Sequence, residues 1–161
     1  RMVAALANGG QVWKPEFVQK VQLIGQTPVY ESAPEAVETL DFDPSLFELI
    51  QQAMCNVTLD PNGTARYIYH DWYEFHETDV VVCGKTGTAQ SGGVGQKPGA
   101  WFAAFAPQDD PEIAIAVVVE NSCEGSEVSS PIVARIVEDY YGLPHYEYPS
   151  FWQTGCFALG D

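Results

Sequence analysis

Two apolar runs in the second half of the chain constrain its fold more than any other feature. Residues 113–120 begin Ile-Ala-Ile-Ala-Val-Val-Val, an almost continuously apolar stretch that predicts a central strand buried on both faces. Residues 101–105, Trp-Phe-Ala-Ala-Phe, predict a second strand. The Pro-Gln-Asp-Asp-Pro sequence at 107–111 is typical of a turn. We therefore expect the two strands to pair as an antiparallel hairpin.

Capping residues mark two helices and the end of a third. Asp43 and Pro44 are suited to the start of a helix, which residues 60–63, Asp-Pro-Asn-Gly, should end. Its apolar face is predicted at helical spacing by Leu46, Ile50, Ala53 and Val57. A second helix is expected from a cap at Ser130 to Gly142. The first residues read as the end of a helix that Asn8-Gly9-Gly10 stops.

The remaining segments are less periodic. Residues 80–83 predict a short strand, 17–24 an extended piece, 25–38 a connection, and 66–79 a long surface loop that could hold a short helix. The predicted class is α+β, with an antiparallel sheet covered by helices. Three strands cannot make a complete two-sided sheet alone, so we expect something outside the chain to pair with them or cover them. Residues 145–161 form an aromatic tail.

Charge excludes whole classes of partner. The 161 residues carry 22 acidic and only 7 basic side chains, a net charge of −15. The basic residues are scattered singly: Arg1, Lys14, Lys20, Arg66, Lys85, Lys97 and Arg135. Without a basic patch, binding to nucleic acid or to an anionic membrane surface is not expected.

The four cysteines, at positions 55, 83, 123 and 156, do not form a metal-binding spacing. We expect isolated buried thiols, with one disulfide as the alternative. Cys83 is expected to be a buried strand residue rather than a reactive thiol. His70, His76 and Glu74 do not fit a compact ligand set, so no metal is expected there. The glycine-rich stretch 91–95 lacks the strand and helix that a phosphate-binding loop needs.

The motif that carries chemistry is Gly-Lys-Thr-Gly-Thr-Ala-Gln at 84–90, directly after the predicted strand 80–83. A Lys-Thr-Gly element of this kind belongs to the signature of β-lactamases and penicillin-binding proteins. Its context agrees: a glycine-rich loop follows, then the two apolar strands and a proline-capped helix. Upstream, Ala-Leu-Ala-Asn-Gly-Gly, Trp-Lys-Pro-Glu-Phe-Val and Gly63-Thr64-Ala65 also fit.

Residues 1 to about 142 therefore resemble the C-terminal part of the transpeptidase domain of a class B penicillin-binding protein, most closely the elongation-type, cell-shape members. The resemblance implies a partial penicillin-binding, serine β-lactamase-like fold over residues 1–144. It also implies a peptidoglycan D,D-transpeptidase that uses an acyl-serine intermediate, is inhibited by β-lactams, and needs no metal or organic cofactor.

The resemblance gives roles to the residues of the motif. Lys85 and Thr88 are the expected catalytic residues. Lys85 would hold the carboxylate of a stem peptide and tune proton transfer, and the backbone N–H of Thr88 would donate to the oxyanion. Thr86 would bind the same carboxylate, and Gly87 would allow close approach of the substrate backbone. Without the motif, these would be a solvated lysine and two ordinary strand threonines.

Gln90 and Trp101 flank the expected cleft. By resemblance they would line the substrate groove together with residues 85–88. For Trp101 the alternative of a hydrophobic core residue stays open, because an aromatic side chain in a strand is as often packed inside.

Two motifs of the family are missing. None of the eight serines has a lysine three residues later or an asparagine two residues later. Both motifs precede the Lys-Thr-Gly element in the family. We therefore expect the chain to be a fragment cut inside a helix, inactive alone and prone to self-association through exposed apolar surface.

The resemblance places the parent protein on the outer face of the bacterial cell membrane, held by an N-terminal anchor and working with cell-wall glycosyltransferases. Its expected ligands are peptidoglycan stem peptides and β-lactams. Three alternatives remain open: a β-lactam sensor domain, a serine β-lactamase, and a non-catalytic interaction protein of the same fold. Deacylation rate would separate a lactamase from the others.

Overall fold

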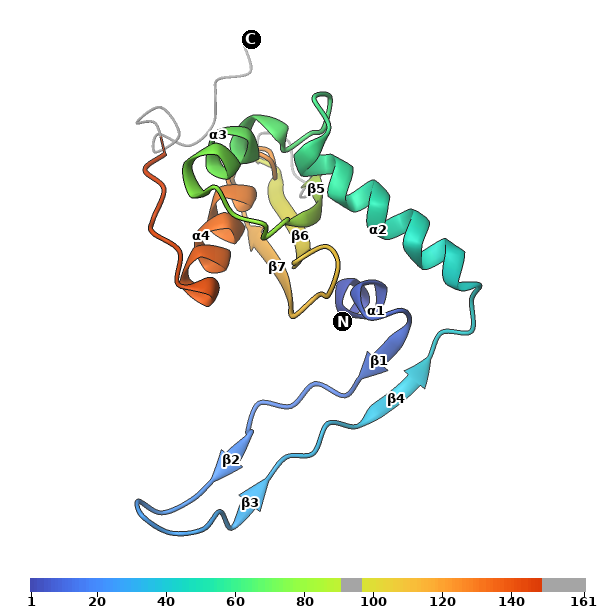
Figure 1. The fold of residues 1–161 in the computed structure, drawn as a ribbon, viewed down its shortest axis with the longest axis vertical. Coiled ribbons are helices and arrows are strands. Elements are labelled where there is room, and N and C mark those ends of the chain that lie inside the picture. Colours follow the sequence, from blue (N-terminus) through green and yellow to red (C-terminus); the bar gives the residue numbers. More distant parts are fainter. Residues whose placement is uncertain (91–96, 149–161) are drawn as a thin grey trace.

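The computed structural model describes residues 1–90 and 97–148, which form a body and a projecting ribbon (Figure 1). The elements run α1 (Met2–Ala7), β1 (Gln11–Trp13), β2 (Lys20–Val21), β3 (Tyr30–Glu31), β4 (Ala36–Thr39), α2 (Pro44–Leu59), α3 (Arg66–His76), β5 (Cys83–Ala89), β6 (Gly99–Ala106), β7 (Ile113–Val119) and α4 (Ser129–Tyr141). The mixture of helices and antiparallel strands confirms the predicted α+β class. No described helix is long and apolar enough to cross a membrane.

The body is built on a three-stranded antiparallel sheet in the order β5-β6-β7. The β6–β7 hairpin is confirmed, with Trp101 opposite Val118. On its other side β6 pairs with β5, with Gly87 opposite Trp101. This register places the Lys-Thr-Gly element in the middle of a strand rather than at its end.

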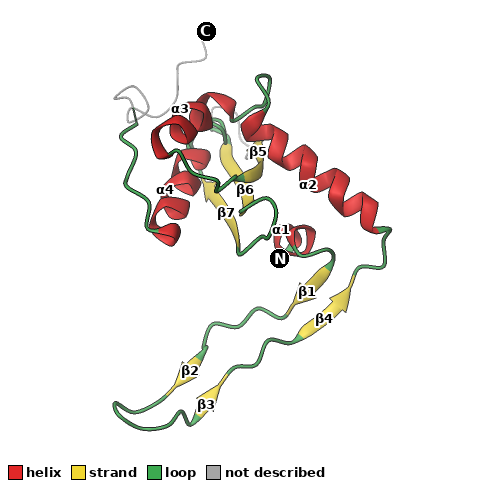
Figure 2. Cartoon of the chain, viewed as in Figure 1, coloured by secondary structure: helices red, strands yellow, loops and turns green. Residues whose placement is uncertain are grey.

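The two faces of the sheet differ. One face packs against α3 and α4, and its core contains the fully buried Tyr69, Trp72 and Phe102. The other face packs against α1 and α2 through a smaller cluster that includes Met54 and Phe105. Helices thus lie on both sides of the sheet (Figure 2).

Strand β7 corrects the expectation of a strand buried on both faces. Only Ile115 is buried, and residues 114, 116 and 118 are exposed. The strand lies at the edge of the described sheet, and α1 and α2 cover only part of this face. A continuous apolar run is therefore not sufficient evidence that both faces are covered.

Residues 66–79 also differ from the expected surface loop. Most of this segment is α3, whose Tyr69 and Trp72 are completely buried. Tyrosine hydroxyls and the Trp72 indole find polar partners inside, so a sequence that looked too polar for a core helix packs as one.

The strand expected at 80–83 begins only at Cys83. Side chains, not a neighbouring strand, hold the backbone before it. The Thr58 hydroxyl donates to the Val82 carbonyl oxygen at 2.6 Å, and the Val82 N–H donates to the Tyr73 hydroxyl at 3.0 Å. These contacts replace strand pairing.

Both long helices form where expected, with two differences. The Asp43 carboxylate accepts from the Ser45 N–H, which confirms the predicted cap. However, α2 buries Phe47, Met54, Cys55 and Thr58, whereas Leu46, Ile50 and Ala53 of the predicted apolar face are exposed and Val57 is half-buried. In α4, Ser130 is inside the helix and donates to the Ser126 carbonyl oxygen, so it is not the cap.

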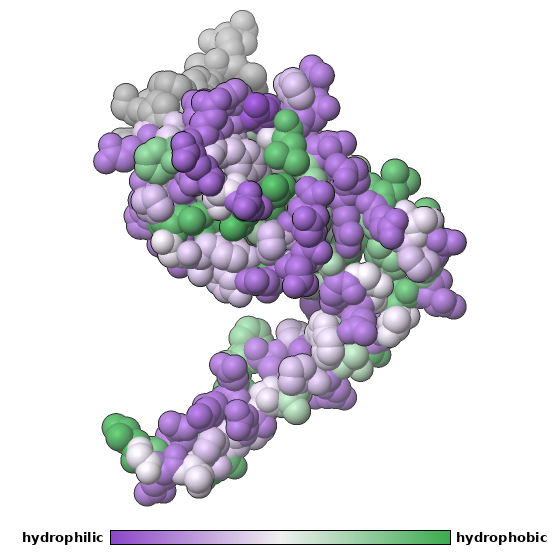
Figure 3. Space-filling view, viewed as in Figure 1, coloured by the Kyte–Doolittle hydropathy of each residue, from purple (hydrophilic) through white to green (hydrophobic). Residues whose placement is uncertain are grey.

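The ribbon is made of β1 paired with β4 and β2 paired with β3, so residues 25–38 contain the returning strands rather than a plain connection. It extends away from the body, with apolar side chains at its tip (Figure 3). Phe17 and Ile24 are fully exposed. At the other end of the chain, Tyr146 and Tyr148 of the predicted tail pack against the main core. Residues 149–161 lie outside the described part.

Candidate active-site strand

Strand β5 is an edge strand within the described sheet, and it carries the motif. Its first residues, Cys83 and Gly84, are buried, whereas Lys85 and Thr88 are exposed and Thr86 and Gly87 are half-buried. The Lys85 ammonium donates to the Thr86 carbonyl oxygen at 2.6 Å. Among residues 1–90 and 97–148, no strand pairs with the other backbone edge of residues 85–89.

The turn between α2 and α3 reaches this edge. The Thr64 and Thr86 hydroxyl oxygens lie 2.9 Å apart, which is hydrogen-bond distance. The sequence analysis noted Thr64 only as part of a family-like tripeptide and gave it no role at the site. The one sequence feature that could have indicated a role for Thr64 is its position directly after the turn that ends α2.

Gly87 leaves space where a side chain would stand. A Cβ at this position would lie 3.3 Å from the Trp101 Cβ, tight enough to require a small shift. The backbone of Gly125 packs from the α4 side of the sheet, where a Cβ would lie 1.9 Å from the Trp101 carbonyl oxygen. The absence of a side chain at Gly87 and at Gly125 thus lets neighbouring backbone lie close to the centre of the sheet.

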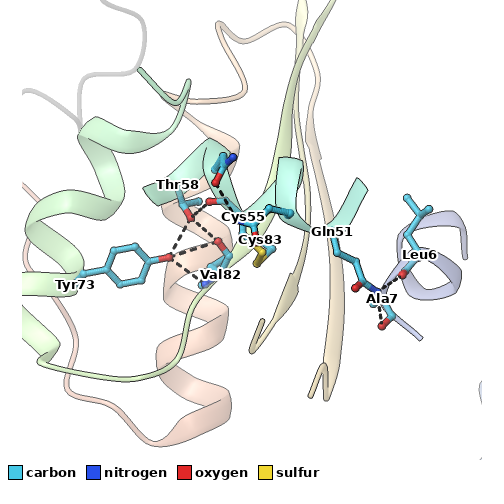
Figure 4. The surroundings of a disulfide bond; sticks show 10 residues. Leu6, Ala7, Gln51, Cys55, Thr58, Tyr73, Val82 and Cys83 are labelled. Atoms are coloured by element: carbon cyan, nitrogen blue, oxygen red, sulfur yellow. Dashed lines mark hydrogen bonds between the residues drawn. A yellow bond between two sulfur atoms is a disulfide. The ribbon is translucent and has the colours of Figure 1, made fainter. Parts of the chain in front are cut away.

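A disulfide fixes the start of β5. Cys55 of α2 bonds to Cys83, and both residues are completely buried (Figure 4). Cys123 is also disulfide-bonded. The expectation of isolated thiols is therefore wrong for these three residues, although Cys83 is buried in a strand as expected. Helix and strand positions, which spacing in sequence does not reveal, decide the pairing. Cys156 lies outside the described residues.

An apolar hollow of about 600 Å³ lies beside the motif. It is formed by α1, α2, β5 and β6, and its lining includes Ile50, Ala53, Val57, Lys85, Thr86, Gly87 and Trp101. Three residues of the predicted apolar face of α2 therefore line this hollow, and one of them, Val57, also packs against the main core. This explains the apolar periodicity of α2, which its buried residues alone do not account for.

The structure brings most of the predicted site residues together. Lys85, Thr86, Gly87 and Trp101 line the apolar hollow, and Gln90 and Trp101 line a second hollow of about 360 Å³. Thr88 is exposed on the strand between them and lines neither. Trp101, exposed by 46%, is a surface residue in this structure and not part of the core.

The histidines considered for a metal lie on α3, away from the motif. The Nδ1 atom of His70 is 3.4 Å from carboxylate oxygens of Asp71 and Glu74. His76 lies apart from them, with its ring nitrogens 2.7 and 2.8 Å from the carbonyl oxygens of Trp72 and Pro144. His76 therefore links α3 to the C-terminal segment. The glycine-rich stretch 91–95 falls within residues that the structure does not describe.

Most of this chain has a counterpart among known proteins. Residues 1–138 match the family model of the penicillin binding protein transpeptidase domain. The chain belongs to this family. The predicted resemblance to class B penicillin-binding proteins is thereby confirmed, as is the transpeptidase fold.

Individual relatives agree. Peptidoglycan D,D-transpeptidase PbpA of Mycolicibacterium smegmatis is 42% identical over 142 residues, which cover 82% of this chain and 26% of the relative. Peptidoglycan D,D-transpeptidase MrdA of Haemophilus influenzae is 30% identical over 149 residues, which cover 84% of this chain and 22% of the relative. Among solved structures, the crystal structure of Pseudomonas aeruginosa PBP2 in complex with WCK 5153 matches with 32% sequence identity and a TM-score of 0.64. The match covers 86% of this chain and 28% of the PBP2 chain. The chain thus spans about a quarter of the length of these relatives.

Proposed function

We propose that β5 is the substrate-binding strand of a peptidoglycan D,D-transpeptidase that cross-links stem peptides and is acylated by β-lactams. The observation that carries this proposal is that Lys85 and Thr88 are exposed, and Thr86 and Gly87 half-buried, along a strand edge with which no other described strand pairs. An extended peptide can add to such an edge as a further strand. The names of the relatives support the reaction class.

Each group of the motif has a task in this proposal. The Lys85 ammonium attracts the terminal carboxylate of the stem peptide, and the Thr86 hydroxyl donates to the same carboxylate. Gly87 lets the substrate backbone lie against the strand. The backbone N–H of Thr88 donates to the oxyanion of the tetrahedral intermediate, which typically contributes about 3–4 kcal/mol of transition-state stabilisation.

The nucleophile is proposed to come from outside these 161 residues. No serine of the chain stands in a Ser-x-x-Lys or Ser-x-Asn sequence. The apolar hollow beside Lys85 offers a surface against which an apolar helix bearing such a serine can pack. The chain alone is then expected neither to acylate nor to turn over substrate.

Localisation and partners follow from the same proposal. A protein that cross-links peptidoglycan works outside the cytoplasm, where disulfides such as Cys55–Cys83 persist. We further propose that the whole protein is anchored in the membrane and acts with a cell-wall glycosyltransferase. Self-association of the isolated chain is expected through its exposed apolar surfaces.

The rate of acylation by a fluorescent penicillin tests the role of Lys85. In the longer protein that contains this chain, Lys85→Gln should slow acylation about 100-fold, since a charge that stabilises the transition state is lost. Lys20→Gln is the matched control, because Lys20 lies on the ribbon opposite Glu31. Equal rates in the two variants would contradict the proposal.

A further inference from the structure

A histidine and two carboxylates meet on the outer face of α3. The Nδ1 atom of His70 lies 3.4 Å from an Asp71 carboxylate oxygen and 3.4 Å from a Glu74 carboxylate oxygen. One ligand atom from each of the three side chains lies within 4.8 Å of the other two. The sequence analysis considered His70 and Glu74 together with His76, whereas the fold brings Asp71 into the group and turns His76 toward the Pro144 carbonyl oxygen. The structure thus forms a compact ligand set that the sequence analysis did not expect.

The helical spacing of α3 explains why these three side chains share a face. Residues 70, 71 and 74 stand at i, i+1 and i+4, and positions four residues apart lie one above the other on a helix. The opposite face carries Tyr69 and Trp72, which are fully buried in the main core. The core therefore holds the backbone that bears the cluster. Because α3 lies at the surface of the body (Figure 1), an ion in solution reaches the cluster without movement of the helix.

The Nδ1 atom of His70 is shielded from solvent and lacks a hydrogen-bond partner among residues 1–90 and 97–148. Its two carboxylate neighbours, at 3.4 Å, are farther away than the about 2.7–3.2 Å of an ordinary hydrogen bond. A shielded polar atom without a partner is unfavourable, because it has lost its hydrogen bonds to water. A cation placed between the three side chains would satisfy the nitrogen and both carboxylates together.

The distances within the cluster suit a metal ion. Zinc binds histidine nitrogen and carboxylate oxygen at about 2.0–2.2 Å, so two of its ligands in a tetrahedral arrangement lie about 3.3–3.6 Å apart. Both distances from the His70 Nδ1 atom fall in this range. The two carboxylate oxygens lie within 4.8 Å of each other, so a small rotation of the exposed Asp71 or Glu74 side chain brings them to the same spacing.

The charge and the ligand types of the cluster favour a transition-metal dication. The chain carries a net charge of −15, which attracts cations. In the described part of the chain, neither carboxylate forms an ion pair with a lysine or an arginine, including Arg66 one turn earlier on α3. Imidazole nitrogen is a typical ligand of zinc, whereas magnesium and calcium prefer oxygen ligands alone. The mixed set of one nitrogen and two oxygens therefore favours zinc.

We infer that His70, Asp71 and Glu74 bind a zinc ion on the outer face of α3, with water at the remaining coordination positions. The ion joins two successive turns of α3, whose inner face forms part of the main core, and so stabilises the folded state. The inference is independent of the proposed function, because none of the three residues belongs to the Lys-Thr-Gly motif or lines the hollows beside it.

Isothermal titration calorimetry with Zn²⁺ as the probe tests the inference on the 161-residue chain, and the same variants test it in the longer protein. The unmodified protein should bind Zn²⁺, and saturating Zn²⁺ should raise its melting temperature. His70→Ala and Glu74→Gln should each weaken binding by about 10-fold or more, since each removes a direct ligand. His145→Ala is the matched control, because this exposed histidine already lies 2.8 Å from an Asp139 oxygen, and it should leave the affinity unchanged.

NMR of the histidine side chains identifies the ligand atom, since Zn²⁺ should shift the Nδ1 signal of His70 and not the ring signals of His145. Three results would overturn the inference. The first is equal Zn²⁺ affinity in the unmodified protein and in His70→Ala. The second is no Zn²⁺ binding by a protein whose circular dichroism shows that it is folded. The third is Ca²⁺ or Mg²⁺ binding as tight as that of Zn²⁺, which would show that the carboxylates attract cations without the imidazole.

Discussion

The disulfide between Cys55 and Cys83 joins helix α2 to the first residue of strand β5, two residues before Lys85. A second connection lies nearby, since the Gln51 amide donates to the Leu6 and Ala7 carbonyl oxygens at the end of α1. Together these contacts tie α1, α2 and β5 into one unit. The wall of the apolar hollow and the motif are thus held in a fixed relation.

Replacing both Cys55 and Cys83 with alanine should lower the free energy of unfolding by about 2–4 kcal/mol, because a loop closed across 28 residues is released in the unfolded chain. Urea denaturation under non-reducing conditions measures this. Asn56→Ala, on the exposed side of the same helix, is the control. An unchanged midpoint in the double variant would show that the bond does not stabilise the fold.

Glu138→Ala should lower the free energy of unfolding by about 3–5 kcal/mol, because it leaves buried polar groups without their partner. The fully buried carboxylate lies 2.8 Å from the Arg135 guanidinium and accepts from the Trp72 indole N–H and the Tyr146 N–H. Thermal or urea unfolding measures the loss. Asp139→Ala, one residue along and exposed, should change stability by less than about 0.5 kcal/mol. Similar losses in both variants would contradict the importance of this network.

Gly125→Ala should prevent correct packing of the sheet, since the added Cβ would overlap backbone oxygens of Trp101 and Gly87 that cannot move independently. We expect a loss of more than about 3 kcal/mol, or failure to fold. Gly87→Ala should keep the fold, because its Cβ meets only the Trp101 side chain at 3.3 Å. Circular dichroism and urea titration of the two variants compare them. A well-folded, equally stable Gly125→Ala protein would refute the close approach.

Alkaline pH should destabilise the protein through its tyrosines. Burial raises the pKa of Tyr69 well above its usual value, and burial together with the nearby Glu112 carboxylate raises the pKa of Tyr141 to about 12. The folded state thus favours the neutral phenols. Their contribution to stability is complete below pH about 10 and is lost as pH rises from there through the raised pKa values.

Melting temperatures between pH 8 and 11.5 measure this dependence. Tyr141→Phe keeps the ring and removes the titrating group, so it should reduce the alkaline loss relative to the unmodified chain. Its hydroxyl donates to the Ala106 carbonyl oxygen at 3.3 Å, so a small loss at neutral pH is also expected. An identical alkaline slope in the variant would exclude Tyr141 as a contributor.

Local signals predicted much of this structure. The Asp43 cap, the Gly142 end of α4 with its φ of 66°, and the β6–β7 hairpin depend on neighbouring residues, and all three are confirmed. The Lys-Thr-Gly motif identified the candidate strand, because a lysine and a nearby glycine on one strand edge suit the binding of a peptide carboxylate and its backbone.

Features that depend on tertiary packing could not be predicted in the same way. Residues 66–79 suggested at most a short helix in a surface loop, and the length and burial of α3 did not follow from the sequence. Its aromatic and polar residues satisfy one another only after folding, as with Trp72 and Glu138. The disulfide pairing needed the position of α2 against β5. The exposed face of β7 and the apolar face of α2 carry the same hydrophobic signal as a core, and sequence alone does not tell a covered surface from an open one.

The intact mass of the longer protein that contains this chain, after incubation with penicillin, tests the central proposal most directly. We expect a gain of one drug mass, mapped by peptide sequencing to a serine in a Ser-x-x-Lys sequence outside residues 1–161, and slower formation of the adduct in Lys85→Gln. No gain of mass on a folded protein, or an adduct on one of the eight serines of this chain, would contradict it.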